Sequence, residues 1–351
     1  MDVKEFFRTL SEASGISGYE QDVAEPIKKA CLWADEIRTD KLGNVIMLKK
    51  GHGSEPRPKI MLAAHMDEIG LIITKIEKDG FLRFSTIGGF DQRVLLGQEV
   101  VVHSKTALTG VIGAKPPHVQ AAGEQSKAVK LEDLFIDVGY DTQEQVQELV
   151  RIGDLATIKR EVVGLQGSLL AGKAFDDRAG VAAIFECFKV LAELKHEADV
   201  YGVATVQEEV GLRGAVTSTY GIVPDLGIAI DVGFGDSPGL QESETIKLSQ
   251  GPGIAIGPHV HPKVYARMVE TAKEWNISYS LDPSPSPGGT DAYAIQVARA
   301  GVATILLSIP LRYMHTPIET LDYEDVKRTG RLMALFIAGL DNEFVEGLTC
   351  F

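Results

Sequence analysis

The chain has 351 residues, of which 44% are hydrophobic and 24% charged. This length favours two domains or one large elaborated domain, and the balance of residue types excludes disordered, collagen-like and coiled-coil proteins. Lysine and arginine number 35 against 49 aspartate and glutamate residues, so the formal net charge is −14. Because this negative field would repel a phosphate backbone, nucleic acid is not an expected partner.

The compartment can be judged from three further features. The cysteines Cys31, Cys187 and Cys350 lie far apart, so neither a disulfide framework nor a thiolate metal site is predicted. Residues 1–15 carry charges throughout and lack the apolar core of a signal peptide. No segment approaches the roughly 18 uncharged apolar residues of a membrane span. We therefore expect a soluble cytoplasmic protein without membrane contact.

The first predicted elements are two amphipathic helices, near residues 3–10 and 20–34. A hairpin-like pair of strands follows at residues 36–40 and 45–49. Next comes the apolar run Ile60–Ala64, which is typical of a buried strand.

Between residues 70 and 163 the pattern changes to short β-rich segments without a long helix among them. The predicted strands lie at residues 69–77, 81–86, 100–103, 109–113, 134–138 and 155–159. The first two flank Asp79-Gly80, a typical hairpin turn. This region predicts a small β-barrel or sandwich.

From about residue 172 helices alternate with strands, which is typical of a largely parallel sheet covered on both faces. A long amphipathic helix is predicted first, at residues 177–195. The later predictions are strands at 200–206, 226–232 and 302–309 and helices at 262–275, 291–299 and 323–340. We predict an α/β domain over residues 1–69 and 164–351, interrupted by a β domain over residues 70–163.

Acids and histidines follow the ends of the predicted strands, where functional groups collect in open α/β sheets. They are His65, Asp67, Asp176, Asp177, Glu208, Glu209, Asp231 and His315. Each alone has an ordinary explanation, such as a helix cap or a solvated charge. Together, imidazole and carboxylate groups suit Zn²⁺, Co²⁺ or Mn²⁺, and two histidines with about three carboxylates can hold two cations.

Six motifs carry a family resemblance: AAHMDEIG, KAFDDRAG, TVQEEVGLRGA, AIDVG, PGGTDA and MHTPIET. In this order they resemble the tetrahedral aminopeptidases, dinuclear metallopeptidases that include glutamyl, leucyl and lysyl aminopeptidases and some proteins labelled endoglucanase. The resemblance spans nearly the whole chain. It implies a zinc-peptidase-like α/β fold, with a central mixed, largely parallel sheet flanked by helices and an inserted small β-barrel or PDZ-like dimerisation domain.

The resemblance also implies a metal centre. Asp176 would bridge two divalent metal ions, zinc or cobalt with manganese as a third candidate. His65 and Asp231 would complete one site, and Glu209 and His315 the other.

Two neighbouring acids are implied to act in catalysis. Asp67 would orient the imidazole of His65, and Glu208 would be the general base. The implied reaction is hydrolysis of the N-terminal peptide bond of a peptide by a hydroxide held between the two metals.

Four residues before a predicted helix are candidates for the wall of the substrate pocket: Gly288, Gly289, Thr290 and Asp291. Glycines let the backbone approach a ligand closely, but a loop that caps the next helix explains the same residues equally well. In relatives, the loop equivalent to residues 115–130 approaches the active site of a neighbouring subunit, which adds His118 as a candidate. The resemblance further predicts that the β domain forms dimers and that dimers build a hollow dodecamer.

Two other functions stay open at this point. One is a different hydrolase, either a dinuclear N-acyl amino acid deacylase or a glycosidase, which would use two carboxylates without metal. The other is a non-catalytic binding or assembly protein on the same scaffold. Such a protein would be expected to lack a metal ligand or Glu208, and neither is missing.

Overall fold

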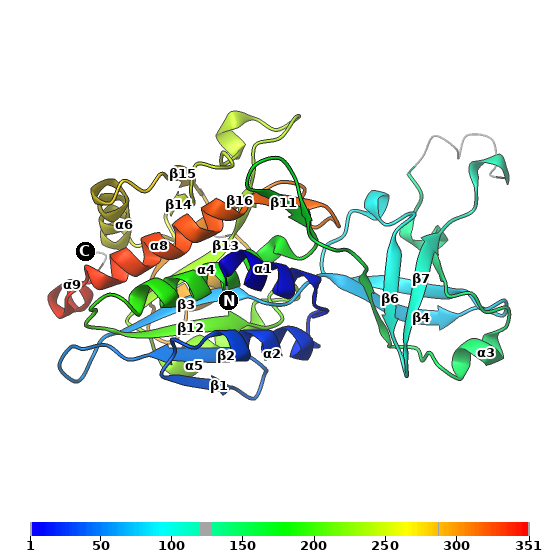
Figure 1. Ribbon diagram of the computed structural model, residues 1–351, viewed down its shortest axis with the longest axis horizontal. Coiled ribbons are helices and arrows are strands. Elements are labelled where there is room, and N and C mark those ends of the chain that lie inside the picture. The colour runs from blue at the N-terminus through cyan, green and yellow to red at the C-terminus, as the bar shows by residue number, and fades with distance from the viewer. Residues whose placement is uncertain (1, 120–127, 287, 350–351) are drawn as a thin grey trace.

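An eight-stranded mixed sheet forms the centre of the larger part of the computed structural model, which describes residues 2–119, 128–286 and 288–349 (Figure 1). In spatial order its strands are β1 (Glu36–Thr39), β2 (Val45–Lys49), β12 (Asp199–Thr205), β3 (Lys59–His65), β13 (Leu226–Phe234), β16 (Ala303–Leu311), β14 (Gly253–Ile256) and β15 (Ser280–Pro283). The four central strands, β12, β3, β13 and β16, are parallel neighbours. Antiparallel pairing occurs toward both edges of the sheet, so the predicted mixed, largely parallel sheet is confirmed.

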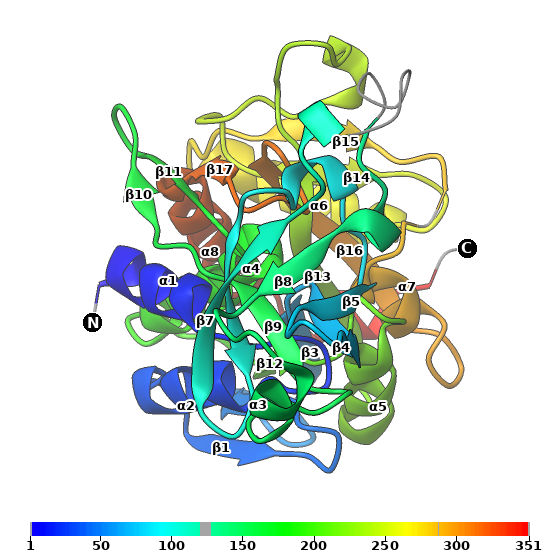
Figure 2. The ribbon, with the colours of Figure 1, turned by 90° about the vertical axis from the view of Figure 1, so that its right-hand side faces the viewer.

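Helices cover both faces of this sheet. Helix α4 (Phe175–Leu191) packs on β3 and β13, and both α1 (Val3–Glu12) and α8 (Tyr323–Ala338) pack on α4. Helices α5 (Arg213–Ile222) and α7 (Asp291–Gln296) pack on each other and on β3, and Figure 2 shows them on the opposite side of the sheet from α1 and α8. The remaining helices are α2 (Gln21–Ala30), α6 (Pro262–Glu274) and α9 (Asn342–Glu346). Burial on both faces explains why the central strands read as continuous apolar runs.

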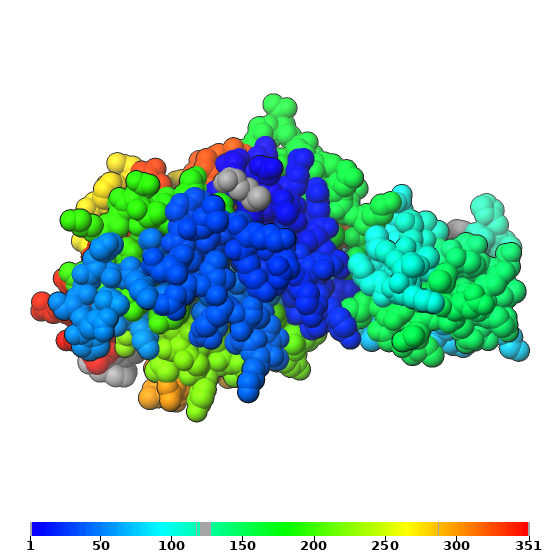
Figure 3. All heavy atoms as spheres, turned by 60° about the horizontal axis from the view of Figure 1, so that its bottom comes forward, coloured from blue at the N-terminus to red at the C-terminus, as the bar shows by residue number. Residues whose placement is uncertain are grey.

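A closed antiparallel β-barrel forms the smaller lobe, on the right in Figures 1 and 3. Its strands, in the order in which they pair, are β4 (Gly70–Ile76), β5 (Leu82–Ile87), β8 (Phe135–Asp137), β7 (Ala107–Gly113), β6 (Glu99–His103) and β9 (Leu155–Ile158). A short helix, α3 (Gln143–Gln147), packs beside β4. The barrel has its own apolar core, separate from the core of the α/β part. The structure thus resolves the predicted barrel or sandwich as a barrel.

A small sheet connects the barrel to α4. It consists of β10 (Val163–Gly164), β11 (Leu169–Gly172) and β17 (Glu319–Asp322), with β11 pairing antiparallel to both neighbours. Because β17 pairs with β11, residues near 319 come to lie beside the start of α4. The sequence patterns did not predict this sheet, nor did they predict α5, β14 or β15.

Several element boundaries differ from the predicted ones. The helix expected over residues 177–195 begins at Phe175 and ends at Leu191, and Asp176 and Asp177 at its start have non-helical backbone angles. Cys31 and Cys187 are buried and free. Cys350, Pro287 and residues 120–127 of the loop 115–130 lie outside the described residues. No described helix combines the length and the apolar character that crossing a bilayer requires.

Candidate metal centre and active site

The candidate site lies at the carboxyl ends of the central strands, where the chain leaves β3 and enters the barrel. Parallel pairing aligns the carboxyl ends of β3 and β12, so that Thr205 lies beside His65 and residues 207–209 follow at the same end of the sheet. Strand β13 brings Asp231 to this end of the sheet, and the segment after β16 brings His315. The structure therefore brings together the five predicted metal ligands from five separate stretches of the chain.

Asp176 lies between the two histidines. Its Oδ1 is 3.0 Å from Nε2 of His65, and its Oδ2 is 3.2 Å from Nε2 of His315. Glu209 completes this side, with Oε1 3.4 Å from the same His315 nitrogen. A carboxylate with one oxygen toward each histidine is the arrangement that a bridging ligand between two cations needs.

A second group of possible donors consists of His65, Asp177 and Asp231, whose nitrogen and oxygen atoms lie within 4.8 Å of one another. Asp177 is already engaged with the backbone: Oδ2 accepts a hydrogen bond from the N–H of His65 and Oδ1 from that of Gly180. The second bond caps the regular helical turns that follow Asp177, because Asp176 and Asp177 themselves have non-helical backbone angles. Asp176 is thereby left to face the histidines, which explains why this stretch needs two aspartates.

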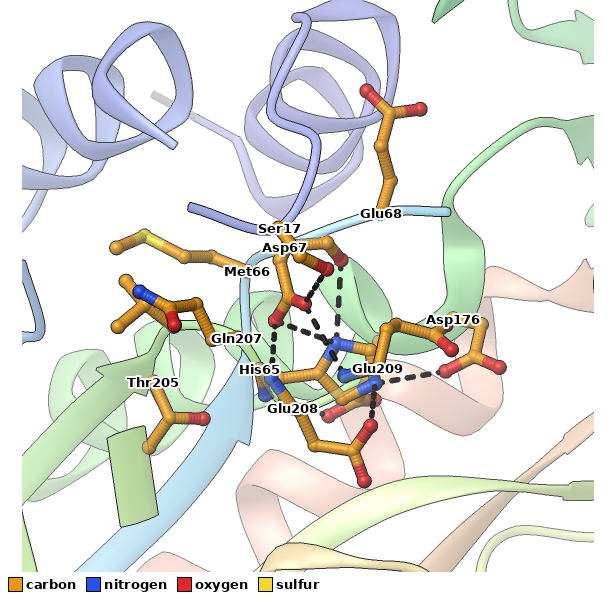
Figure 4. A network of polar contacts seen from close by, with 12 residues as sticks. Ser17, His65, Met66, Asp67, Glu68, Asp176, Thr205, Gln207, Glu208 and Glu209 are labelled. Carbon is orange, nitrogen blue, oxygen red and sulfur yellow. Dashed lines mark hydrogen bonds and ion pairs between the residues drawn. The ribbon is translucent and has the colours of Figure 1, made fainter. Parts of the chain in front are cut away.

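Asp67 fixes the turn that carries both glutamates (Figure 4). Its Oδ1 accepts a hydrogen bond from the N–H of Glu208 at 3.0 Å, and its Oδ2 accepts bonds from the N–H of Glu209 at 3.2 Å and from the hydroxyl of Ser17 at 2.6 Å. Nδ1 of His65 lies 3.2 Å from the Asp67 carbonyl oxygen and 3.6 Å from the carboxylate. The side chain thus touches the backbone of the glutamate pair as well as lying beside the His65 ring.

Glu208 presents its carboxylate to the site. Oε2 lies 3.9 Å from Nε2 of His65, and none of the hydrogen bonds of the described residues uses this carboxylate. Burial, reinforced by the nearby charges of Asp231 and Asp291, raises the pKa of Glu208 to about 10. A buried carboxyl group whose pKa is shifted by burial and by neighbouring charges is a candidate for an acid or base role.

The cluster concentrates negative charge in a buried place. Burial, followed by the charge of Asp176, raises the pKa of Asp231 to about 8. Hydrogen bonds that the His315 ring donates to Asp176 and Glu209 raise the pKa of His315 to about 11. Burial alone would lower the pKa of His65, but the carboxylates of Glu208 and Asp176 hold it well above its usual value. Divalent cations would supply the positive charge that these acids otherwise obtain from protons.

Glu319 supports the candidate site, although the sequence patterns did not single it out within the MHTPIET motif. One carboxylate oxygen accepts hydrogen bonds from the N–H groups of Phe175 and Asp176, and the other accepts one from the N–H of His315 at 2.8 Å. This buried side chain therefore joins the segment that carries Asp176 to the segment that carries His315. The only signal in the sequence was its spacing of four residues from His315.

Glu68 belongs to a different network, and Figure 4 shows its carboxylate pointing away from the cluster. It pairs with Lys173 at 2.7 Å and with Arg178 at 3.2 Å, and all three side chains are buried. Arg178 also donates to the carbonyl oxygens of Leu10 and Ala13 at 2.6 Å each. This triad ties the N-terminal segment to the strand end that carries His65 and Asp67.

A cavity of about 380 Å³ opens beside the cluster. Of the four predicted pocket residues, Gly289 and Thr290 line it, and Gly288 is exposed next to them. Asp291 lies beneath, 2% exposed, where its Oδ2 accepts a hydrogen bond from the Thr205 hydroxyl. His118 lies exposed in the turn Pro117–Val119 of the barrel, and none of the described interactions connects it to the cluster.

The barrel contributes to the site through the turn after β5. A Cβ on Gly89 would lie 3.1 Å from Nδ1 of His315, and one on Gly88 would lie 3.4 Å from Oε2 of Glu209. Phe90 of the same turn lines a small pocket with Asp176, Glu209 and His315. The two lobes therefore meet at the predicted metal ligands Asp176, Glu209 and His315.

Comparison with known proteins gives a consistent result. The family model described as M42 glutamyl aminopeptidase matches residues 43–332. The lysyl aminopeptidase of Pyrococcus furiosus is 40% identical over 335 residues, which cover 93% of this chain and 94% of that protein. The solved structure of a TET aminopeptidase from a marine sediment Thaumarchaeota archaeon superposes with a TM-score of 0.94 at 37% identity, covering 99% of both chains. The TET1 peptidase of Pyrococcus horikoshii, described as assembling into a tetrahedron or a large octahedral shell, superposes with a TM-score of 0.85 at 34% identity, covering 97% of this chain and 100% of that one.

Proposed function

The chain belongs to the M42 glutamyl aminopeptidase family and is a hydrolase of the aminopeptidase type. We propose that its active site is the cluster of acids and histidines at the carboxyl ends of the central strands. The observation that carries this proposal is the position of Asp176, whose two oxygens face His65 and His315 at the border of a cavity. The substrates that we propose are peptides with a free N-terminus.

We propose two divalent cations per subunit, zinc or cobalt with manganese as a third candidate. The donor set fits such ions, because imidazole nitrogens and carboxylate oxygens gather within reach of one another and the described cysteines lie elsewhere. His65 and Asp231 would hold one cation, Glu209 and His315 the other, and Asp176 both. When bound, the cations would activate water and polarise the scissile carbonyl group.

Glu208 is our candidate for the general base. Its carboxylate lines the cavity and has no competing hydrogen bond among the described residues, so it can accept the proton of an attacking water. The same carboxyl group can then pass that proton to the leaving amine. Asp67 supports this role by holding the N–H groups of Glu208 and Glu209, which fixes the direction of both side chains.

The decisive experiment compares metal content with turnover. We expect the metal-stripped protein to be inactive on aminoacyl-p-nitroanilides and to recover when zinc, cobalt or manganese is added. Glu208→Gln should keep two metal ions per subunit by elemental analysis and lose roughly 10²- to 10⁴-fold in kcat. Glu244→Gln, at an exposed position, is the matched control. A fully active Glu208→Gln protein would contradict the base assignment.

We also propose a division of labour between the lobes, with residues 1–69 and 164–351 catalytic and residues 70–163 mediating dimers that build a dodecamer. Support comes from the TET1 relative, described as assembling into shells, and from exposed apolar side chains on the barrel lobe such as Leu96, Val111 and Ile152. Light scattering at micromolar concentration tests the assembly, and a monomer would contradict it.

A further inference from the structure

The cavity beside the cluster has two kinds of wall. One wall consists of ionisable residues of the cluster: His65, Asp176, Glu208, Glu209, Asp231 and His315. The other consists of Val232, Gly233, Phe234, Gly289, Thr290 and Met314. None of the described residues in this second wall carries a charge. A substrate that places its N-terminal peptide bond at the cluster must direct its first side chain toward a wall of this cavity.

The cluster itself does not favour a charged side chain. Two divalent cations would balance the four carboxylates that line the cavity, so this wall of the loaded site would have little net charge to attract lysine. Two other acids lie nearby but do not line the cavity. Asp291 is buried beneath the cluster and bonded to Thr205, and Asp236 pairs with Arg312 at 3.1 Å. Neither Asp236 nor Arg312 is among the described residues that line the cavity.

The uncharged wall has both apolar surface and free space. Phe234, the last residue of β13, is 58% exposed and is one of the residues that line the cavity. Val232 and Met314, which are also apolar, line the same cavity. At Gly289 no heavy atom lies within 4 Å of the position that a Cβ would occupy, so the wall leaves room there. Apolar side chains gain by leaving water for such a surface, at roughly 25 cal/mol per Å².

We propose that this protein prefers peptides whose first residue has a large, uncharged, apolar side chain, such as leucine, methionine or phenylalanine. This inference rests on the proposed aminopeptidase function and names the substrate class of the same site. Phe234, Val232 and Met314 supply the contact surface, and Gly289 leaves the space that a large side chain fills. Lysine and glutamate would bring a charge against this wall without a partner, which burial makes unfavourable.

Rates and binding together test the preference. For the metal-replete protein, we expect kcat/KM to be at least about tenfold higher for leucyl-, methionyl- and phenylalanyl-p-nitroanilide than for the lysyl and glutamyl substrates. Calorimetry should show the same order for binding of free L-leucine, L-lysine and L-glutamate, independently of turnover. A lysyl or glutamyl preference in both assays overturns the inference and leaves the proposed function intact. No cleavage of any aminoacyl substrate overturns the proposed function itself.

A change of charge in the wall tests the role of Phe234. We expect Phe234→Glu to raise the ratio of lysyl to leucyl kcat/KM by about tenfold, because the new carboxylate would pair with the lysine ammonium group. Phe234→Gln is the matched control, which changes shape similarly without adding charge. Equal ratios in the two variants would show that Phe234 does not contact the substrate side chain.

A change of size tests the free space at Gly289. We expect Gly289→Leu to lower kcat/KM for leucyl and phenylalanyl substrates by about tenfold or more and to leave the alanyl substrate close to its original value. Gly221→Leu is the control, since Gly221 lies exposed on α5, also with no heavy atom within 4 Å of its Cβ position. An equal loss for the alanyl substrate would overturn the assignment of Gly289.

Discussion

The two lobes differ in what they bury. Within the described part of the barrel, Thr157 is the only buried polar residue, and the remaining core side chains are apolar. The α/β part buries many ionisable side chains around its site: Glu20, His65, Asp67, Glu68, Lys173, Asp176, Asp177, Arg178, Glu208, Asp231, Asp291 and Glu319. Buried charges require partners, whereas apolar burial requires only shape and area.

This difference separates what stabilises each lobe. The barrel depends on its apolar core and on a closed sheet without open edges. The α/β part depends in addition on ion pairs, capped carboxylates and, in our proposal, bound cations. Changes in charge, metal and pH should therefore act on the α/β part and leave the barrel largely unaffected.

The largest effect that we expect follows from removing Arg178. This fully buried guanidinium pairs with Glu68 and donates to the carbonyl oxygens of Leu10, Ala13 and Met66. Arg178→Met would leave Glu68 with one cation fewer and leave those oxygens without a donor. We expect a loss of about 3–5 kcal/mol in the free energy of unfolding, measured by denaturant titration.

The barrel supplies the matched control. Arg93 pairs with Asp91 on the barrel, where the arginine side chain is 74% exposed. Arg93→Met should change stability by about 0.5 kcal/mol at most, because exposed ion pairs contribute little. Similar losses in the two variants would remove the contrast between the lobes.

The second prediction concerns metal removal. We expect zinc at about 100 times its dissociation constant to stabilise the stripped protein by about 2.7 kcal/mol. Hydrogen exchange should slow most in Ile60–Glu68 and in residues 205–209, which carry or adjoin proposed ligands, and little in β6 and β7 of the barrel. Equal protection in the barrel strands would show that the lobes respond to metal as one unit.

The third prediction concerns pH and Glu20. Burial raises the pKa of this carboxyl group to about 7, although it accepts hydrogen bonds from the N–H groups of Gly18 and Gln207. A raised pKa stabilises the fold fully below the unfolded value near 4.5 and loses that contribution as pH rises toward 7. Glu20→Gln keeps an acceptor oxygen and does not titrate. Between pH 4.5 and 7, the wild type should therefore lose about 2 kcal/mol relative to Glu20→Gln.

Thermal melts at a series of pH values measure this difference. Glu144→Gln, at an exposed position on the barrel, should melt in parallel with the wild type at every pH. Parallel curves for Glu20→Gln as well would mean that Glu20 does not titrate in this range.

Much of the fold followed from the sequence because the central strands are buried on both faces and read as apolar runs. The Asp79-Gly80 turn likewise predicted the β4–β5 pairing, which is confirmed. Helix α5 was missed because its sequence, RGAVTSTYGI, is poor in strong helix formers. Strand β17 was missed because its four residues pair with β11, far away in the chain.

The candidate site could likewise be predicted only in part. The acids and histidines at strand ends could be named because each lies in a short motif. The supporting bonds could not, since Asp67 reaches the backbone of Glu208 and Glu319 reaches the backbone of Asp176 across more than 140 residues each. Such contacts depend on tertiary packing, which local patterns do not encode. The roles of His118 and of the Gly288–Asp291 segment stay predictions.

The smallest effect that we expect concerns the barrel turn that lies against the cluster. Because a Cβ on Gly89 would lie 3.1 Å from Nδ1 of His315, Gly89→Ala should push that ring away from Glu209 and Asp176. We expect metal affinity, measured by calorimetry, to fall about five- to tenfold, or roughly 1 kcal/mol. Gly164→Ala, whose added methyl group would meet no atom within 4 Å, should bind metal like the wild type. If both variants bind metal equally well, the barrel turn only lies beside the proposed metal centre. A selective loss of affinity in Gly89→Ala would mean that the barrel helps to set the geometry of the metal centre in the α/β part.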